Sequence, residues 1–310
     1  MSLRPSLEKC DIMKKIQKFI TTKKHWQILA KQWEMYTEPG RPGKEDIKNY
    51  DRLIKITLGN KKKAKVVVLG ATPEIRDLLY KYYLLNNIQV VCVDMMPEMY
   101  QAMNELVTIK ITNEKFIHSD WLKMKFPKNS IDLFIGDLVI GNLPNKEIRG
   151  QFLENIRCAL KKDGCFIPRH WWATPKTKLE NVKLHLFNYT ERVIKEDLTI
   201  KQAASYLRCD LLAGSWHRNK ENITSTVFYA PDIKKLSKYF TKKYLSDRDK
   251  IAKAIFQYAL KIFTGKRWCY FDKVGEIKQL NEFFAIKKIL FSHYSIFTEN
   301  SPILLLKPKK

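Results

Sequence analysis

The chain has 310 residues, and with 45% hydrophobic and 12% aromatic residues its composition is that of a globular protein rather than a disordered one. No apolar run approaches the roughly 20 residues that span a membrane, and the first residues lack the pattern of a secretory signal. The formal net charge of +25 favours nucleic acid, acidic membranes or anionic substrates as partners.

The positive charge comes mainly from lysine, because 45 of the 57 basic residues are Lys and only 12 are Arg. Surfaces that read bases or grip phosphates tend to be richer in Arg. An AT-rich genome would produce the same bias, and we favour that interpretation over a nucleic-acid surface. The six cysteines form no C-x-x-C pair and no zinc spacing. The sequence therefore predicts no metal site and a reduced, cytoplasmic protein.

Residues 1–60 have a helical pattern, interrupted by a loop at Thr37–Gly43 (TEPGRPG). A buried strand is expected at Val66–Leu69, and a helix follows Gly70. Four further strands are predicted after it, namely Ile88–Asp94, a short one within Lys115–Trp121, Ser130–Asp137 and one that begins at Cys165. Helices are predicted to start at Pro97 and near Asn145, the latter ending at Gly164.

Strands and helices alternate with short connections, which predicts an α/β protein with a doubly wound, mostly parallel sheet. Residues 171–272 break the alternation with helical patterns and one β-like run, Ser225–Ala230. Two final strands, for seven in all, flank a turn at residues 300–302. We expect an N-terminal helical segment (1–60), an α/β core (61–170), a mainly helical insertion or cap (171–272) and a closing helix with strands (273–310).

Ligands of such sheets bind at the carboxyl ends of the strands. Gly70 permits close backbone approach after the first strand. Asp94 follows 24 residues later, where an acid can bind both ribose hydroxyls, and Asp120 can accept from a base amine. The missing second and third glycines argue against a pyrophosphate, and Pro73 removes one N–H donor. The pattern predicts a nucleoside ligand without phosphates.

The segments VVVLGATPE, VVCVDMMPEMY, FIHSDW, IDLFIGDLVIGNLP and LKKDGCFIPR, in this order, resemble the class I S-adenosylmethionine-dependent methyltransferases. The resemblance covers about residues 64–170 and the two closing strands. It implies a Rossmann-like fold and S-adenosylmethionine as the cofactor. The chain departs from the family where a G-x-G-x-G motif is usual, because Ala71 and Pro73 stand in that loop.

The resemblance also implies a set of cofactor contacts. The loop Gly70, Ala71, Thr72 and Pro73 passes the methionine moiety, Asp94 with Met95 lies at the ribose, Asp120 with Trp121 flanks the adenine, and Asp137 with Leu138 lines the methionine and transfer region. In some of these proteins a helix start upstream of the core folds over the cofactor, which brings Tyr36 and Arg41 close. Simple packing of that segment is the alternative.

Methyl transfer needs a general base only when the acceptor carries a proton at neutral pH. The candidates are Asp137, His170 and His118, and a structural role is the alternative for each histidine. The sequence RHWW leaves the fifth strand where substrate pockets form, so Arg169 and Trp171, together with Asn142, are substrate candidates. A contact between core and cap is the alternative for the tryptophans.

The favoured function is therefore methylation of an O, N or S atom of a small molecule enclosed by the insertion. An RNA methyltransferase that uses the basic surface is the second hypothesis, but the fourth strand is followed by Gly136-Asp137-Leu138 and not by an N-P-P-Y motif. The third is an inactive methyltransferase-like scaffold that binds a partner. A nicotinamide-dependent enzyme is disfavoured by the missing glycines.

Overall fold

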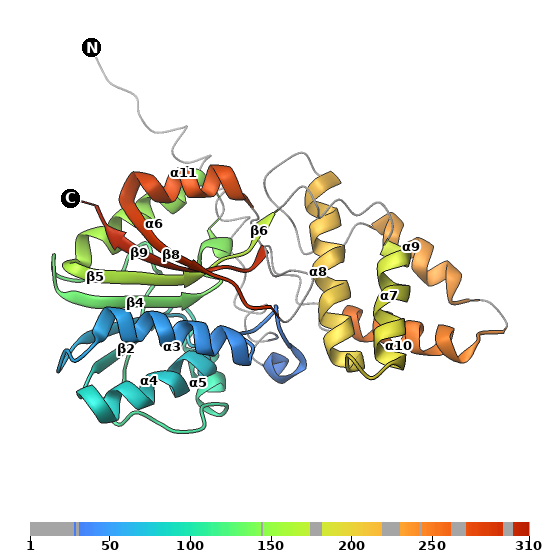
Figure 1. Ribbon diagram of the computed structural model, residues 1–310, viewed down its shortest axis with the longest axis horizontal. Helices are drawn as coiled ribbons and strands as arrows, with labels where there is room; N and C mark the ends of the chain where they lie inside the picture. The colour runs from blue at the N-terminus through green and yellow to red at the C-terminus, as the bar shows by residue number, and fades with distance from the viewer. Residues whose placement is uncertain are drawn as a thin grey trace, which may run out of the picture.

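The structure is a computed structural model that describes residues 28, 31–143, 145–173, 182–218, 230–241, 244–261, 271–293 and 300–309. These residues form a seven-stranded sheet with helices on both faces and a group of helices at one end of it (Figure 1). The arrangement confirms the predicted α/β, Rossmann-like, doubly wound class.

The sheet has the strand order β3-β2-β1-β4-β5-β9-β8. Its strands are β3 (Lys115–His118), β2 (Gln89–Asp94), β1 (Lys65–Leu69), β4 (Ile131–Asp137), β5 (Leu160–Arg169), β9 (Ile303–Pro308) and β8 (Phe284–Leu290). The pairs from β3 to β5 are parallel, and β9 is antiparallel to both of its neighbours. The chain order reverses between β1 and β4, which is the topological switch point where open α/β sheets bind ligands.

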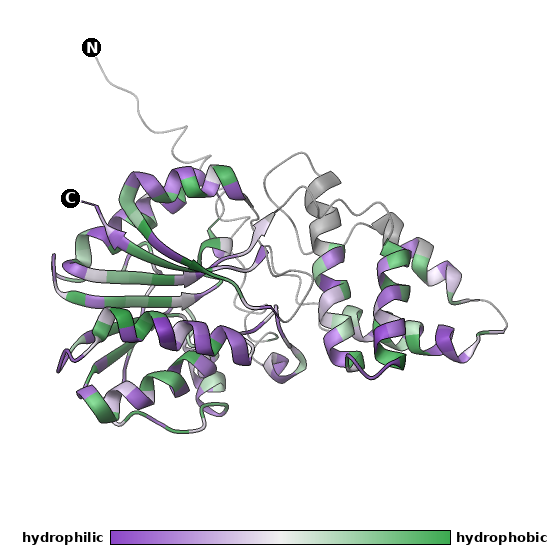
Figure 2. Ribbon diagram, in the orientation of Figure 1, coloured by the Kyte–Doolittle hydropathy of each residue, from purple (hydrophilic) through white to green (hydrophobic). Residues whose placement is uncertain are grey.

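Helices cover both faces of the sheet because its central strands are apolar on both sides, as Figure 2 shows. One face packs against α3 (Lys44–Leu58) and α4 (Pro73–Asn86), and the other against α6 (Lys146–Ala159) and α11 (Lys273–Phe283). Short α5 (Pro97–Asn104) follows β2. Proline stands at the first position of α4 and α5, where its missing N–H leaves no helical bond unmade.

The predicted end of α6 at Gly164 is wrong. The helix ends at Ala159, Leu160 already has extended backbone, and Gly164 lies inside β5. A Cβ at this position would lie 2.9 Å from the carbonyl oxygen of Ile131, beside an irregularity in the β4–β5 register. The glycine therefore permits two strands to approach closely, a role that produces the same local sequence signal as a helix cap.

Four helices lie at the end of the sheet toward which the arrowheads of β4 and β5 point (Figure 1). They are α7 (Val182–Ile194), α8 (Ile200–Arg218), α9 (Ala230–Tyr239) and α10 (Asp247–Lys261), and we call them the cap. They share an apolar cluster of their own, and the short strands β6 (Trp172–Ala173) and β7 (Phe271–Asp272) pair beside them. Most of the predicted β-like run lies outside the described residues, and Ala230 begins α9. The four predicted segment boundaries stay a prediction.

No helix in the described part of the chain is long and apolar enough to cross a membrane. Within the same residues, no group of three or more His, Cys, Asp and Glu side chains could hold a metal ion.

A half-buried ion pair joins two cap helices and makes their stability depend on pH. His185 Nδ1 lies 3.1 Å from Asp210 Oδ2, which also accepts a 2.6 Å hydrogen bond from Tyr189. The hydrogen bond to Asp210 raises the pKa of His185 above its usual 6.5, although burial opposes the rise. A raised pKa gives stability that is present below the unfolded-state pKa and lost as pH rises through the folded-state value.

We therefore expect His185→Gln to lower the melting temperature more at about pH 6 than at about pH 9. Thermal unfolding followed by circular dichroism at both values measures the difference. His118→Gln is the control, because the exposed His118 contacts a backbone carbonyl and no carboxylate. Equal losses for His185→Gln at the two pH values would contradict the assignment.

Candidate functional site

The carboxyl ends of β1 and β2 bring three of the predicted cofactor residues together. Gly70 has φ +93°, a conformation that L side chains rarely adopt. A Cβ at Gly70 would lie 3.9 Å from Asp94 Oδ2 and 3.9 Å from the indole ring of Trp121. The bare backbone, a carboxylate and an aromatic ring thus converge on one point after β1.

Backbone hydrogen bonds hold these groups in place. The Gly70 N–H and the Trp121 Nε1–H both donate to the carbonyl oxygen of Val93, each at 2.8 Å. Asp94 Oδ1 accepts a 2.8 Å hydrogen bond from the Met96 N–H, and the side chain is mostly buried at the last position of β2. The convergence fits a nucleoside, because Gly70 permits close approach, Asp94 offers acceptors for ribose hydroxyls, and Trp121 offers an apolar ring.

Two further predicted residues, Met95 and Asp120, stand next to Asp94 and Trp121 in the sequence. Met95 is 36% exposed beside Asp94, and its carbonyl oxygen lies 3.1 Å from His118 Nε2. Asp120 Oδ1 accepts a 2.9 Å hydrogen bond from the Leu122 N–H, which is a local turn contact. Asp120 is therefore placed after β3 as predicted, with one oxygen already occupied by backbone.

The first loop lies under the N-terminal segment. Ala71 and Thr72 are buried, and Pro73 begins α4. Ala71 shares an apolar cluster with Trp33, in the short helix η1 (Trp33–Met35), and with Tyr36, which follows it. The sequence predicted that this segment folds over the cofactor, with simple packing as the alternative, and the cluster places Tyr36 beside Ala71, as either would require.

Arg41 contacts the first turn of α4, which directly follows the same loop. Its guanidinium forms an ion pair with Glu74 and lies 5.9 Å from the centre of the Trp33 ring. Burial raises the pKa of Glu74, and the charge of Arg41 opposes that rise. The predicted cofactor-covering role of Tyr36 and Arg41 stays a prediction, but both residues stand where it requires them.

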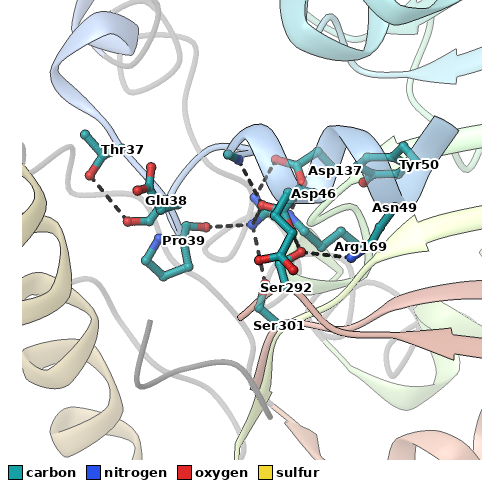
Figure 3. Close-up of polar contacts among 12 residues, drawn as sticks. Thr37, Glu38, Pro39, Asp46, Asn49, Tyr50, Asp137, Arg169, Ser292 and Ser301 are labelled. Carbon is teal, nitrogen blue, oxygen red and sulfur yellow. Dashed lines mark hydrogen bonds and ion pairs between the residues drawn. The ribbon is translucent and has the colours of Figure 1, made fainter. Parts of the chain in front are cut away.

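Arg169 and Asp137 form a buried ion pair at the ends of β5 and β4 (Figure 3). Arg169 Nε donates to Asp137 Oδ1 at 2.5 Å, and Nη2 donates to Oδ2 at 3.1 Å. Both oxygens of Asp137 thus accept from one guanidinium, the bidentate geometry that best stabilises a carboxylate. Such an oxygen is poorly placed to accept a proton from an acceptor substrate.

The same guanidinium joins distant parts of the chain. Arg169 Nη1 donates to the carbonyl oxygen of Pro39 at 3.0 Å and to Ser301 Oγ at 3.4 Å, and it lies 3.4 Å from Asp46 Oδ2. Figure 3 shows these contacts converging from the N-terminal loop, α3, β5 and the turn before β9. Arg169 has no exposed surface, so its guanidinium serves protein partners, and a substrate contact stays a prediction.

The backbone after β4 is strained. Leu138 has φ +51°, which is costly for a residue with a side chain, and its N–H donates to the Arg169 carbonyl oxygen at 3.1 Å. The carbonyl oxygen of Leu138 accepts from Asn142 Nδ2 at 3.1 Å. Asn142 Oδ1 is buried without a hydrogen-bond partner among the described residues. Strain and an unpaired acceptor together mark this turn as a functional candidate.

His170 follows β5 directly and is 99% buried, with 1% of its surface exposed. Its Nδ1 lies 2.7 Å from Glu276 Oε1 in α11. Its Nε2 has no hydrogen-bond partner within the part of the chain that the structure describes. Trp171 packs against the cap's apolar cluster, whereas the next residue, Trp172, is buried in the core of the sheet domain.

The cap touches the covering segment through one face of α8. Ser205 Oγ accepts a 3.3 Å hydrogen bond from the Thr37 N–H, and Gln202 Nε2 donates to Glu38 Oε1 at 3.1 Å. These two contacts place α8 against the N-terminal segment, which in turn packs on Ala71 of the first loop.

Several residues of the site were not predicted from the sequence. Glu276 and Arg208 lack any local motif, and only tertiary contacts bring them to the site. Asp46 did carry a signal, since it stands three residues after Gly43 and accepts a 2.9 Å hydrogen bond from its N–H, as a capping residue does.

Comparisons with known proteins agree with this geometry. Residues 75–167 match the protein family described as "Methyltransferase domain". A search of curated protein sequences finds no match. A solved structure from Rhodobacter sphaeroides, described as a Zn-dependent alcohol dehydrogenase, has 13% identity and a TM-score of 0.50 over 94% of this chain and 100% of its own. At this identity the similarity supports the fold alone.

Two methyltransferase structures are also similar. The N-methyltransferase NodS from Bradyrhizobium japonicum WM9, in complex with S-adenosyl-L-homocysteine, has 9% identity and a TM-score of 0.48 over 93% of this chain and 100% of its own. The 1,6-didemethyltoxoflavin-N1-methyltransferase from Burkholderia thailandensis has 10% identity and a TM-score of 0.45 over 85% of this chain and 78% of its own. Residues 75–167 thus match a methyltransferase domain, and the sheet order agrees with the Rossmann-like fold of class I S-adenosylmethionine-dependent methyltransferases.

Proposed function

We propose that the chain transfers a methyl group from S-adenosylmethionine to an O, N or S atom of a small molecule that carries a proton at that atom. In this proposal Gly70 to Pro73 lie along the methionine moiety, and Asp94 with Met95 binds the ribose. Asp120 and Trp121 flank the adenine. Leu138 and Asn142 shape the transfer region.

The packing of the N-terminal segment and of α8 near the strand ends supports a small acceptor. Segment 33–38 lies over the first loop, and α8 is hydrogen-bonded to that segment through Ser205 and Gln202. A folded RNA strand needs an open groove with phosphate contacts along its length, whereas a small acceptor can be surrounded. The net charge of +25 still makes RNA the second candidate, and the assay below includes it.

The single observation that carries the proposed chemistry is the state of His170. A carboxylate only accepts hydrogen bonds, so Nδ1 is the donor to Glu276, and in the neutral imidazole the lone pair then lies on Nε2. Nε2 is buried and has no hydrogen-bond partner among the described residues. This is the base-and-orienter arrangement of general base catalysis, and Asp137 lacks it because both its oxygens accept from Arg169.

The cofactor supplies an electrophilic methyl group on a sulfonium ion. As the acceptor atom bonded to that methyl carbon, the carbon–sulfur bond would break and S-adenosylhomocysteine would leave. His170 Nε2 would take the proton from the acceptor, and the Glu276 carboxylate would stabilise the imidazolium that results. Arg169 and Asp137 act as positioning residues, since their ion pair fixes the ends of β4 and β5 against each other. The cap and the segment over the loop exclude water.

Transfer of tritium from methyl-labelled S-adenosylmethionine tests the function. The purified chain is incubated with pools of phenols, amines, carboxylates and thiols in one arm and with total RNA in the other. We expect label in the small-molecule arm only. Label in RNA alone would overturn the proposed acceptor class, and label in neither arm despite cofactor binding would favour the inactive scaffold.

With the acceptor found, His170→Gln is expected to lower kcat by about 10²–10⁴, because general base catalysis contributes that factor. Glu276→Gln should lower kcat less, because the amide oxygen can still accept the hydrogen bond from Nδ1. His118→Gln is the matched control and should keep kcat within about twofold. An unchanged kcat in folded His170→Gln would remove the base from the proposal.

A further inference from the structure

Arg208 is a buried cation that the structure leaves without hydrogen-bond partners for two of its nitrogens. It lies in α8, and 5% of its surface is exposed. Its Nε and Nη2 atoms are buried, and neither has a hydrogen-bond partner within the described residues. The guanidinium carbon lies 5.1 Å from the centre of the Tyr36 ring.

This arrangement is unfavourable in the protein by itself. A buried guanidinium needs its five N–H groups satisfied, and a contact with an aromatic face satisfies none of them. Two other buried arginines are paired with acids, Arg76 with Glu114 and Arg169 with Asp137. Arg208 differs from both, because the described residues offer it no carboxylate within ion-pair distance. An anion from outside the chain would supply the missing acceptors.

The position of Arg208 places such an anion at the candidate site. Ser205 and Gln202, one and nearly two turns earlier on α8, bind the segment at residues 37–38. Tyr36, under the guanidinium, belongs to the apolar cluster that includes Ala71 of the first loop. Arg208 therefore lies where the cap meets the strand ends. The proposed function requires the acceptor at this place.

The pKa of Cys209, the next residue on α8, also depends on the charge of Arg208. Burial raises the pKa of Cys209 to about 12, and the charges of both Arg208 and Arg169 oppose that rise. Cys209 thus lies within electrostatic reach of the ion pair at the ends of β4 and β5.

We propose that Arg208 binds an anionic group, a carboxylate or a phosphate, of the methyl acceptor. The proposal rests on the proposed function and narrows its acceptor to an anionic small molecule. The planar guanidinium can donate to both oxygens of such a group, and the Tyr36 ring lies against one of its faces. The carboxylate of the cofactor's own methionine moiety has the same chemistry, so the experiment separates the two sources.

Titration calorimetry with benzoate and with inorganic phosphate, on protein saturated with S-adenosylhomocysteine, tests the proposal. We expect saturable binding of at least one probe, weakened about tenfold or more in Arg208→Met. Arg248→Met is the matched control, because Arg248 also lies over an aromatic ring, that of Phe187 at 5.0 Å, but is half exposed and paired with Glu191. Binding of neither probe to the intact protein, or equal binding to Arg208→Met, would overturn the proposal.

The cofactor arm distinguishes the source of the anion. S-adenosylhomocysteine carries the amino-acid carboxylate, and 5′-methylthioadenosine lacks it. We expect Arg208→Met to keep the Kd of both within about twofold. A loss of about tenfold for S-adenosylhomocysteine alone would assign Arg208 to the cofactor and contradict the proposal. Failure of the unmodified protein to bind either compound would instead contradict the proposed function.

Protein stability gives an independent readout. Removing an unpaired buried charge should leave the melting temperature of Arg208→Met unchanged or higher when no anion is present. A purely structural arginine would give a lower melting temperature and unchanged probe binding, which would overturn the proposal. Arg208→Lys keeps the charge without the planar fork, so it should weaken probe binding even if the methionine variant does not fold.

Discussion

Asp94→Ala is expected to abolish measurable binding of S-adenosylmethionine and S-adenosylhomocysteine. Asp94 ends β2 beside Gly70, and its Oδ2 lies 3.9 Å from the point where a Cβ of Gly70 would stand. Two hydrogen bonds from ribose hydroxyls to a carboxylate contribute about 1.5–3 kcal/mol each, so their loss raises the Kd roughly 100-fold or more. Titration calorimetry of both proteins with both compounds measures the change.

The control for this experiment is Asp77→Ala. Asp77 also lies near the start of the core, but its exposed carboxylate accepts from the Thr108 N–H and hydroxyl, away from the strand ends. It should bind both compounds as the unmodified protein does. Because Asp94 also accepts from the Met96 N–H, thermal unfolding must show that Asp94→Ala remains folded. A folded Asp94→Ala that binds with unchanged Kd would remove Asp94 from the cofactor site.

Arg169→Met is expected to lower the free energy of unfolding by about 3–5 kcal/mol, because it leaves buried carboxylates without their counter-charge. Asp137 and Asp46 both contact this guanidinium, and the side chains of all three residues have at most 4% of their surface exposed. The variant also loses the hydrogen bonds to Pro39 and Ser301 that hold the N-terminal loop and the turn before β9. Urea unfolding of both proteins gives the difference.

Arg157→Met provides the comparison, since Arg157 pairs with Glu154 on the surface of α6 and such pairs contribute about 1 kcal/mol or less. The double variant Arg169→Met/Asp137→Leu should recover part of the loss, because it removes one of the stranded carboxylates. A loss below about 1 kcal/mol in Arg169→Met would show that water or rearranged donors replace the guanidinium.

Regular elements of the sheet domain were predicted where one local cause decides the structure. An uninterrupted apolar run fits a buried strand, as at β1, β2 and β4. A proline fits the first position of a helix, as in α4 and α5. Gly164 shows where this reasoning fails. A glycine at the end of a helical pattern is typical of a cap, but the chain uses it to let β5 approach β4.

The sequence by itself determined the class of fold and the residues at the strand ends, because the alternation of elements fixes which positions follow each parallel strand. Gly70, Asp94 and Trp121 could be named for this reason. Only the tertiary structure decided how those residues are partnered. It paired Asp137 with Arg169, gave His170 its Glu276, and turned Arg208 toward the site. Glu276 stands more than a hundred residues further along the chain than His170, and Arg208 stands about forty residues further. Both reach the site from helices outside the sheet. Contacts over such separations depend on how helices pack on the sheet, and no local pattern of residues encodes that packing.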